Sequence, residues 1–126
     1  MTDDNLDGVN FKKLFASIDA MDTESFLSFI HKDATFRFGS TPAVSGHAEI
    51  SVAVEGFFSS FAALQHDLQR VITDGDAVAC EGEVTYTSHD GSKITLPFVN
   101  VFEIDGELIL QYRVYIDIAP LFNAAT

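Results

Sequence analysis

The spacing of hydrophobic residues divides the chain into a helical first half and a β-rich second half. Up to residue 62, apolar residues recur every three or four positions, which is typical of amphipathic helices. The three apolar stripes are Phe11, Leu14, Phe15, Ile18 and Met21; Phe26, Leu27, Phe29 and Ile30; and Ile50, Ala53, Val54, Phe57, Phe58 and Phe61. We therefore predict three helices, the second capped by Asp22 or Thr23 and the third beginning near Gly46. A short strand over 34–38 is expected between the second and third helices.

From residue 64 onward the hydrophobic period falls to two, which indicates half-buried strands. Strands are predicted over 64–73, 78–87, 93–104 and 108–118, with turns at 74–76, 89–92 and 105–106. Pro97 lies inside the third of these strands, which indicates a bulge or a segment at the edge of the sheet. Helices followed by an antiparallel meander predict an α+β fold, in which a curved antiparallel sheet carries the three helices on its concave face.

Strand alternation also predicts which side chains face the helices. On the last strand, Tyr112 and Val114 are predicted to point inward, whereas Ile109 points outward. The inward face is almost wholly apolar, and its polar exceptions are His66, Arg70, Tyr86, Asn100 and Tyr112. Any chemistry on this face therefore has to come from these five residues.

Composition and charge narrow the classes of function. A chain of 126 residues is predicted to form a single domain, 1–126. Its formal net charge of −12 argues against a nucleic-acid partner, because such partners require Lys and Arg facing the phosphates. The lone cysteine and the lack of a signal-peptide pattern or of an apolar run of about 20 residues predict a cytoplasmic protein without a membrane partner.

Phenylalanine dominates the aromatic residues: the chain has 12 Phe, 3 Tyr and no Trp. Because Phe has no polar group, this set suits either a filled, Phe-rich core or a pocket for an apolar ligand. Composition leaves both interpretations open.

The order of the predicted elements resembles the nuclear transport factor 2-like superfamily. This cone-shaped α+β fold includes ketosteroid isomerases, limonene epoxide hydrolases, scytalone dehydratases and SnoaL-like polyketide cyclases. The resemblance is carried by 33–36 (DATF), 45–50 (SGHAEI), 74–78 (DGDAV) and 100–109 (NVFEIDGELI). The closing segment 112–117 (YRVYID) is similar to the final-strand signature of the SnoaL-like group. The resemblance implies a cone whose concave side holds the site, and it covers nearly the whole chain.

The catalytic residues of these relatives are not matched in full. The base and the two oxyanion donors of the steroid isomerases correspond to Phe38, Leu14 and Asn100, so only Asn100 could still donate a hydrogen bond to a carbonyl. The catalytic positions of the limonene epoxide hydrolases fall on Gly82, Val84 and Val114, none of which does acid–base chemistry. A slip of one residue would place Glu81 and Glu83 there, but alternation makes both point outward.

Two residues are the candidates for catalysis. His66 is either a general acid or base or a hydrogen-bonded core residue, and Asn100 binds a ligand, a water molecule or the backbone. The resemblance and the inward face together predict a ligand pocket made of Leu14, Phe36, Phe38, Phe57, Tyr86, Phe98, Asn100, Tyr112 and Val114. No metal and no cofactor are predicted, because the histidines lack metal-ligand spacing and the chain has no Gly-rich phosphate loop.

Two functions are compatible with these residues. The first is a SnoaL-like module that binds a small apolar molecule in a Phe-lined cone. The second is an isomerase, cyclase or dehydratase that acts on a carbonyl-containing polycyclic or terpenoid-like substrate. The resemblance also implies a homodimer formed through the outer sheet face, although that face is otherwise expected to be solvated; it carries Glu81, Glu83, Thr85, Arg113, Tyr115 and Asp117.

Overall fold

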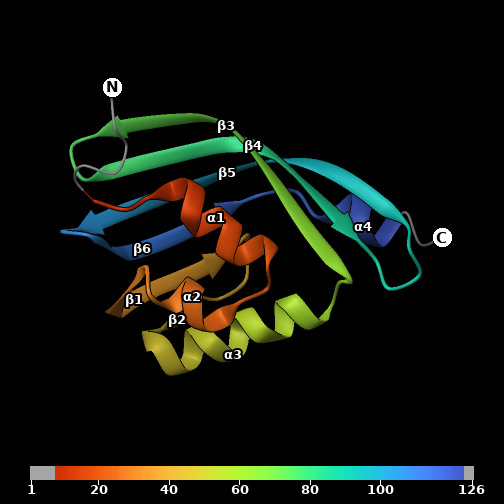
Figure 1. Cartoon of the computed structure of the whole chain (residues 1–126), viewed down its shortest axis with the longest axis horizontal. Helices are drawn as coiled ribbons and strands as arrows, with labels where there is room; N and C mark the ends of the chain where they lie inside the picture. The colour runs from red at the N-terminus through yellow and green to blue at the C-terminus, as the bar shows by residue number, and fades with distance from the viewer. Residues whose placement is uncertain (1–7, 124–126) are drawn as a thin grey trace.

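The computed structural model describes residues 8–123 and confirms the α+β order, with the helices in the N-terminal half (Figure 1). The first half comprises α1 (Phe11–Asp19), α2 (Thr23–Leu27), β1 (Ile30–Phe38), β2 (Val44–Ser45) and α3 (Gly46–Ser59). The second half comprises β3 (Ala63–Asp74), β4 (Ala77–Thr87), β5 (Lys93–Asp105), β6 (Leu108–Tyr115) and α4 (Ala119–Asn123). The last strand was predicted to reach residue 118; it ends at Tyr115, and the short helix α4 follows.

The junction between α1 and α2 is fixed by local hydrogen bonds. The Met21 backbone N–H donates to the Ile18 carbonyl at 2.9 Å, and that of Asp22 donates to the Ser17 carbonyl at 3.0 Å. This pair of hydrogen bonds usually ends a helix that is followed by a glycine in the left-handed conformation. Here Met21 adopts that conformation, with φ 54°. Asp22 then caps α2 by accepting from the Ser25 N–H at 3.1 Å, which decides between the two predicted caps.

The six strands form one curled, unclosed sheet in the order β2-β1-β6-β5-β4-β3. The meander from β3 to β6 is antiparallel, as predicted, but β1 pairs with β6 in parallel. The predicted curved antiparallel sheet therefore contains one parallel pair. Parallel neighbours need a long crossover, and the whole segment between β1 and β6 supplies it. The helices α1, α2 and α3 lie on one side of this sheet (Figure 1).

A bulge in β3 moves Arg70 away from the inward face. Leu68 pairs with Gly82, but Arg70 pairs with Glu81, so Gln69 is an extra residue in β3. Because directly paired residues share a face, Arg70 lies with Glu81 on the outer face and is exposed. The predicted inward position of Arg70 is therefore wrong.

A second irregularity reverses the prediction for Ile109. Glu103 pairs with Gln111, but the next partners are Ile104 and Ile109, so the register between β5 and β6 shifts. Ile109 is consequently fully buried, together with Tyr112. Pro97 needs no bulge: the pairing of β5 with β6 begins only at Val99, so Pro97 lies in an edge segment.

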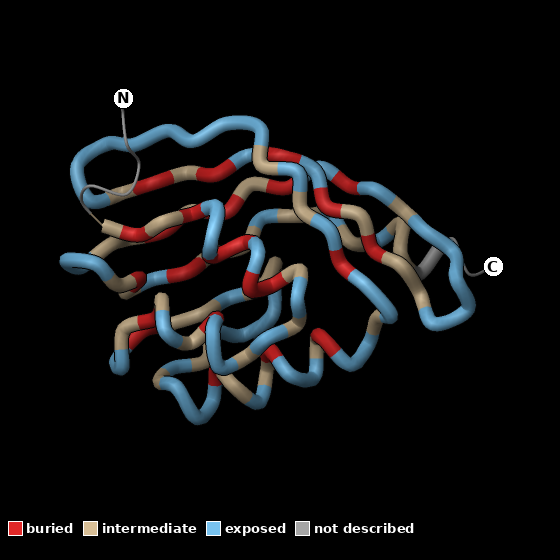
Figure 2. The backbone as a smooth tube through the Cα atoms, in the orientation of Figure 1, coloured by how far each residue is buried: buried red, intermediate tan, exposed pale blue. Residues whose placement is uncertain are grey.

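Burial follows the pleat of the central strands. Along β4 every second residue from Val78 to Tyr86 is buried, and Figure 2 shows this alternation of buried and more exposed positions. Among the described residues, none of the helices has the length and hydropathy needed to cross a membrane.

Candidate functional site

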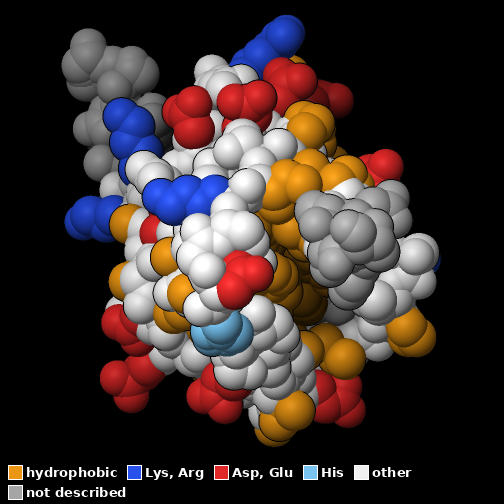
Figure 3. Space-filling view, turned by 90° about the vertical axis from the view of Figure 1, so that its right-hand side faces the viewer, with side chains coloured by type: hydrophobic (Ala, Val, Ile, Leu, Met, Phe, Trp, Pro, Cys, Tyr) orange, Lys and Arg blue, Asp and Glu red, His pale blue; other side chains and the backbone are white. Residues whose placement is uncertain are grey.

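The wide end of the cone is hollow and encloses a cavity of about 340 Å³. Its wall comes from α1, α2, α3, every strand from β1 to β6 and the connection between β1 and β2. Figure 3 shows the hollow from outside, with hydrophobic side chains inside it. Polar residues on the wall are few: Thr41, Ser60, His66, Tyr86, Asn100 and Tyr112. Of the two interpretations left open by the Phe content, a filled core describes one end of the cone and a cavity the other.

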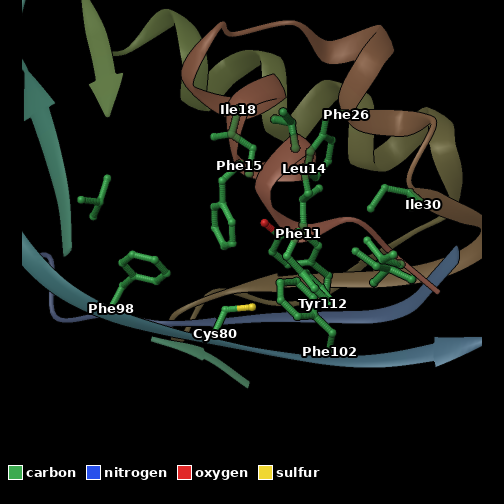
Figure 4. Close-up of a cluster of buried hydrophobic side chains, with 14 of the residues drawn as sticks. Phe11, Leu14, Phe15, Ile18, Phe26, Ile30, Cys80, Phe98, Phe102 and Tyr112 are labelled. Carbon is green, nitrogen blue, oxygen red and sulfur yellow. The ribbon is translucent and has the colours of Figure 1, made fainter. Parts of the chain in front are cut away.

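Most of the predicted pocket residues come together around this cavity. The lining residues among them are Phe36, Phe38, Phe57, Tyr86, Phe98, Asn100, Tyr112 and Val114. Leu14 does not line it; the side chain is fully buried in the narrow end of the cone. There α1 fills the space: Phe11 stacks on Phe102 with ring centroids 5.2 Å apart, and Figure 4 shows Phe11 and Leu14 above Tyr112 and Phe102.

His66 on β3 is held by Asp19 at the end of α1. The Nδ1 atom of His66 lies 2.6 Å from Oδ1 of Asp19, and the backbone N–H of His66 donates to the two carboxylate oxygens at 3.0 and 3.1 Å. The imidazole ring also lies between Phe15 and Phe98, at centroid distances of 5.0 and 5.2 Å. The side chain of His66 is 11% exposed and lines the cavity. Asp19 was not among the predicted site residues.

This arrangement determines the role of each nitrogen of His66. Because a carboxylate only accepts hydrogen bonds, Nδ1 carries the proton that Asp19 accepts. Within the side chains described, Nε2 makes no hydrogen bond, so this nitrogen is free to exchange a proton in the cavity. A histidine oriented by a carboxylate is the arrangement used in general acid–base chemistry.

Asn100 is the second polar group on the cavity wall, and it lacks a protein partner. Its side chain is 3% exposed, and its Oδ1 is buried without any hydrogen-bond partner in the described part of the chain. On the sheet it lies between Cys80 of β4 and Val114 of β6, neither of which offers a strong donor. An unpaired buried amide costs about 1–3 kcal/mol. Asn100 is therefore a residue of the cavity wall whose amide oxygen has no partner among the described residues.

Tyr86, Tyr112 and Cys80 stay protonated at neutral pH. Burial raises the pKa of Tyr86 to about 12 and that of Cys80 to about 12. Burial, and next the neighbouring Cys80, raises the pKa of Tyr112 as well. These groups can donate hydrogen bonds, but they do not supply a base or a thiolate nucleophile.

His66 and Asn100 face different parts of the cavity. Phe98 and Asn100 are two residues apart on β5, which places their Cα atoms about 6.6 Å apart. The ring of Phe98, in turn, stands 5.2 Å from that of His66. A ligand that touches both polar groups therefore has to extend past Phe98. Within the described residues, no group of three His, Cys, Asp or Glu side chains is placed to hold a metal ion.

The family model of the SnoaL-like domain matches residues 11–112, so the chain belongs to the SnoaL-like family. No curated protein matches the sequence significantly.

Solved structures confirm the nuclear transport factor 2-like fold. A protein of unknown function with this fold from Burkholderia pseudomallei has a TM-score of 0.82 at 16% identity, over 90% of this chain and 92% of that one. TerC, crystallised with polyporic acid, has a TM-score of 0.80 at 21% identity, over 90% and 92%. A protein provisionally described as a SnoaL-like polyketide cyclase, from Jannaschia sp. CCS1, has a TM-score of 0.80 at 18% identity, over 90% and 87%.

Proposed function

We propose that the chain binds a small, largely apolar molecule in the cavity and holds it through Asn100. The observation that carries this proposal is the cavity itself, whose largely apolar wall includes Asn100 with its buried, unpaired Oδ1. An enclosed cavity of about 150 Å³ holds a benzene molecule. A volume of about 340 Å³ therefore has room for about two rings. The fold-related TerC was crystallised with the small molecule polyporic acid, which supports a ligand-binding role for this fold.

Two measurements test this proposal. Native mass spectrometry of gently purified protein, followed by solvent extraction, is expected to reveal a co-purifying small molecule. Titration with 2-naphthol, a two-ring probe with one hydroxyl, is expected to give saturable binding that is weakened at least 10-fold by Asn100→Leu. Thr85→Val, on the outer face, serves as the control and should bind like the wild type. Absence of any saturable binding would overturn the proposal.

The dyad of His66 and Asp19 favours a second candidate function, in which the bound molecule is also a substrate. Nε2 of His66 would remove a proton from a carbon next to a carbonyl, and Asp19 would stabilise the imidazolium that forms. The same proton could then return to a different carbon or to a leaving hydroxyl. This chemistry is that of an isomerase, cyclase or dehydratase acting on a carbonyl-containing polycyclic or terpenoid-like substrate. Asn100 would bond an oxygen at the far end of such a substrate.

Proton transfer is tested by isotope exchange. The ketone 2-tetralone in D₂O is expected to exchange its protons next to the carbonyl faster with the protein than without it, as followed by NMR. His66→Gln should lower the added rate about 100-fold, and Asp19→Asn should lower it as well. His89→Gln is the matched control, because His89 bonds the Ser59 carbonyl outside the cavity. An unchanged rate in His66→Gln would exclude this second function.

We further propose that the chain is a cytoplasmic, single-domain protein that forms a homodimer through its outer sheet face. Tyr115 supports the interface, because it is 53% exposed on that face. Light scattering during size-exclusion chromatography is expected to give a molar mass twice that of the chain. Tyr115→Lys should lower the measured mass toward that of the monomer. Val52→Lys, at a 74% exposed position of α3, is the control. A monomeric wild type would contradict the dimer.

A further inference from the structure

Gly56 occupies a position in α3 where neither the backbone nor the packing requires glycine. Its φ does not lie in the left-handed region, and a Cβ built there would meet no atom within 4 Å. Glycine inside a helix is destabilising relative to alanine because its unfolded chain has more freedom to lose. The absence of a side chain therefore needs a reason outside the stability of the helix.

Gly56 lies on the side of α3 that lines the cavity. The cavity-lining positions in and directly after α3 are 53, 54, 56, 57, 58 and 60; of these, 53, 56, 57 and 60 follow the i, i+3, i+4 and i+7 spacing of one helix face. Ala53, Gly56 and Ser60 are small, and Gly56 and Ser60 are exposed, so they lie at the open end of the cavity. Thr41 and Pro42, from the connection between β1 and β2, are also exposed and line the cavity.

The serines at the end of α3 leave this opening clear. The hydroxyls of Ser59 and Ser60 both donate to the Gly56 carbonyl at 2.9 Å, so they fold back onto the helix. Independently, the unpaired Asn100, which is 3% exposed, lines the same cavity and indicates that a ligand enters it.

We propose that Gly56 sets the width of the cavity mouth and thereby selects which ligands enter. The missing side chain lets a flat ring system as wide as two fused rings pass between α3 and the connection that holds Thr41 and Pro42. This inference rests on the proposed ligand binding, and it adds a size filter that is separate from the Asn100 anchor.

The test compares two probes that differ in width and share one hydroxyl: phenol and 2-naphthol. Gly56→Leu is expected to weaken 2-naphthol binding, and to slow its association, at least 10-fold, while phenol binding changes less than 3-fold. Ala48→Leu adds the same side chain at an exposed position of α3 outside the cavity and should leave both unchanged. Gly56→Ala should raise Tm by about 3 °C, because nothing blocks its Cβ.

Each outcome is decisive. Equal binding of both probes by wild type and Gly56→Leu would overturn the size filter and leave the proposed binding function intact. A wild type that binds neither probe would overturn the binding function and this inference with it. A lower Tm in Gly56→Ala would show that glycine serves packing against another surface, which would also contradict the inference.

Discussion

Replacing Asn100 by leucine is expected to stabilise the protein while removing its ligand anchor. The buried amide has no partner within the described residues, so the free protein carries a desolvation cost of about 1–3 kcal/mol. Leucine removes that cost, and the adjacent cavity offers room for its larger side chain. With an unfolding entropy of about 2.1 cal/mol/K per residue, the 126-residue chain should gain about 4–11 °C in Tm.

The assay is thermal unfolding by circular dichroism in the absence of ligand, run beside 2-naphthol titration. Thr85→Val is the matched control: its hydroxyl already lies 2.8 Å from that of Thr95, so no gain is expected. A lower Tm for Asn100→Leu would refute the reasoning, because it would mean that the amide is satisfied in the free protein and holds the sheet together.

Three further predictions concern the stability of the fold around the cavity. Gly82→Ala should lower the free energy of unfolding by at least about 2 kcal/mol in urea titration, because its Cβ would lie 2.0 Å from the Asp67 carbonyl oxygen; Gly56→Ala should show no such loss. Met21→Gly should be about 1 kcal/mol more stable than Met21→Ala, since both lose the same side chain but only glycine adopts φ 54° freely; equal stabilities would contradict this strain. Burial raises the pKa of Cys80 from 9.0 to about 12, so its contribution to stability is complete below pH 9 and is lost as the pH rises toward 12. Cys80→Ala should reduce the alkaline loss between these values, and an unchanged pH profile would exclude Cys80 as its cause.

The meander and the stripes of α1 and α3 were predictable because they rest on local periodicity, whereas the second predicted stripe ran on to Ile30, which belongs to β1. The period of two identified the four strands of the meander, and the stripe of α1 gave its buried hydrophobic residues but not the buried Ser17. Two faces were assigned wrongly, at Arg70 and Ile109, because a single extra residue in a strand reverses the face of the positions on one side of it and leaves no clear mark in the alternation. Gly82 gives a partial indication of the bulge in β3. A glycine inside a strand often marks a place where another backbone comes close, and here the backbone of β3 does so.

The residues that line the cavity were predictable from the sequence, but the contact between His66 and Asp19 was not. The inward rows of the sheet brought the predicted aromatic residues around one cavity, because those rows converge wherever the sheet curls. Asp19 and His66 are 47 residues apart, and their contact depends on how α1 packs on β3. The only local sign is that Asp19 directly follows Ile18, the last cavity-lining residue of α1. Leu14 was misplaced because periodicity gives a face and not the depth along the cone.

The central claim, that Asn100 anchors a ligand inside the cavity, is tested most directly by calorimetric titration of 2-naphthol and naphthalene into wild type and Asn100→Leu. These two ligands differ only in the hydroxyl that Asn100 would bond. The wild type is expected to prefer 2-naphthol at least 10-fold, equivalent to about 1.4 kcal/mol, and Asn100→Leu should lose that preference. An equal preference in both proteins, or none in the wild type, would contradict the claim.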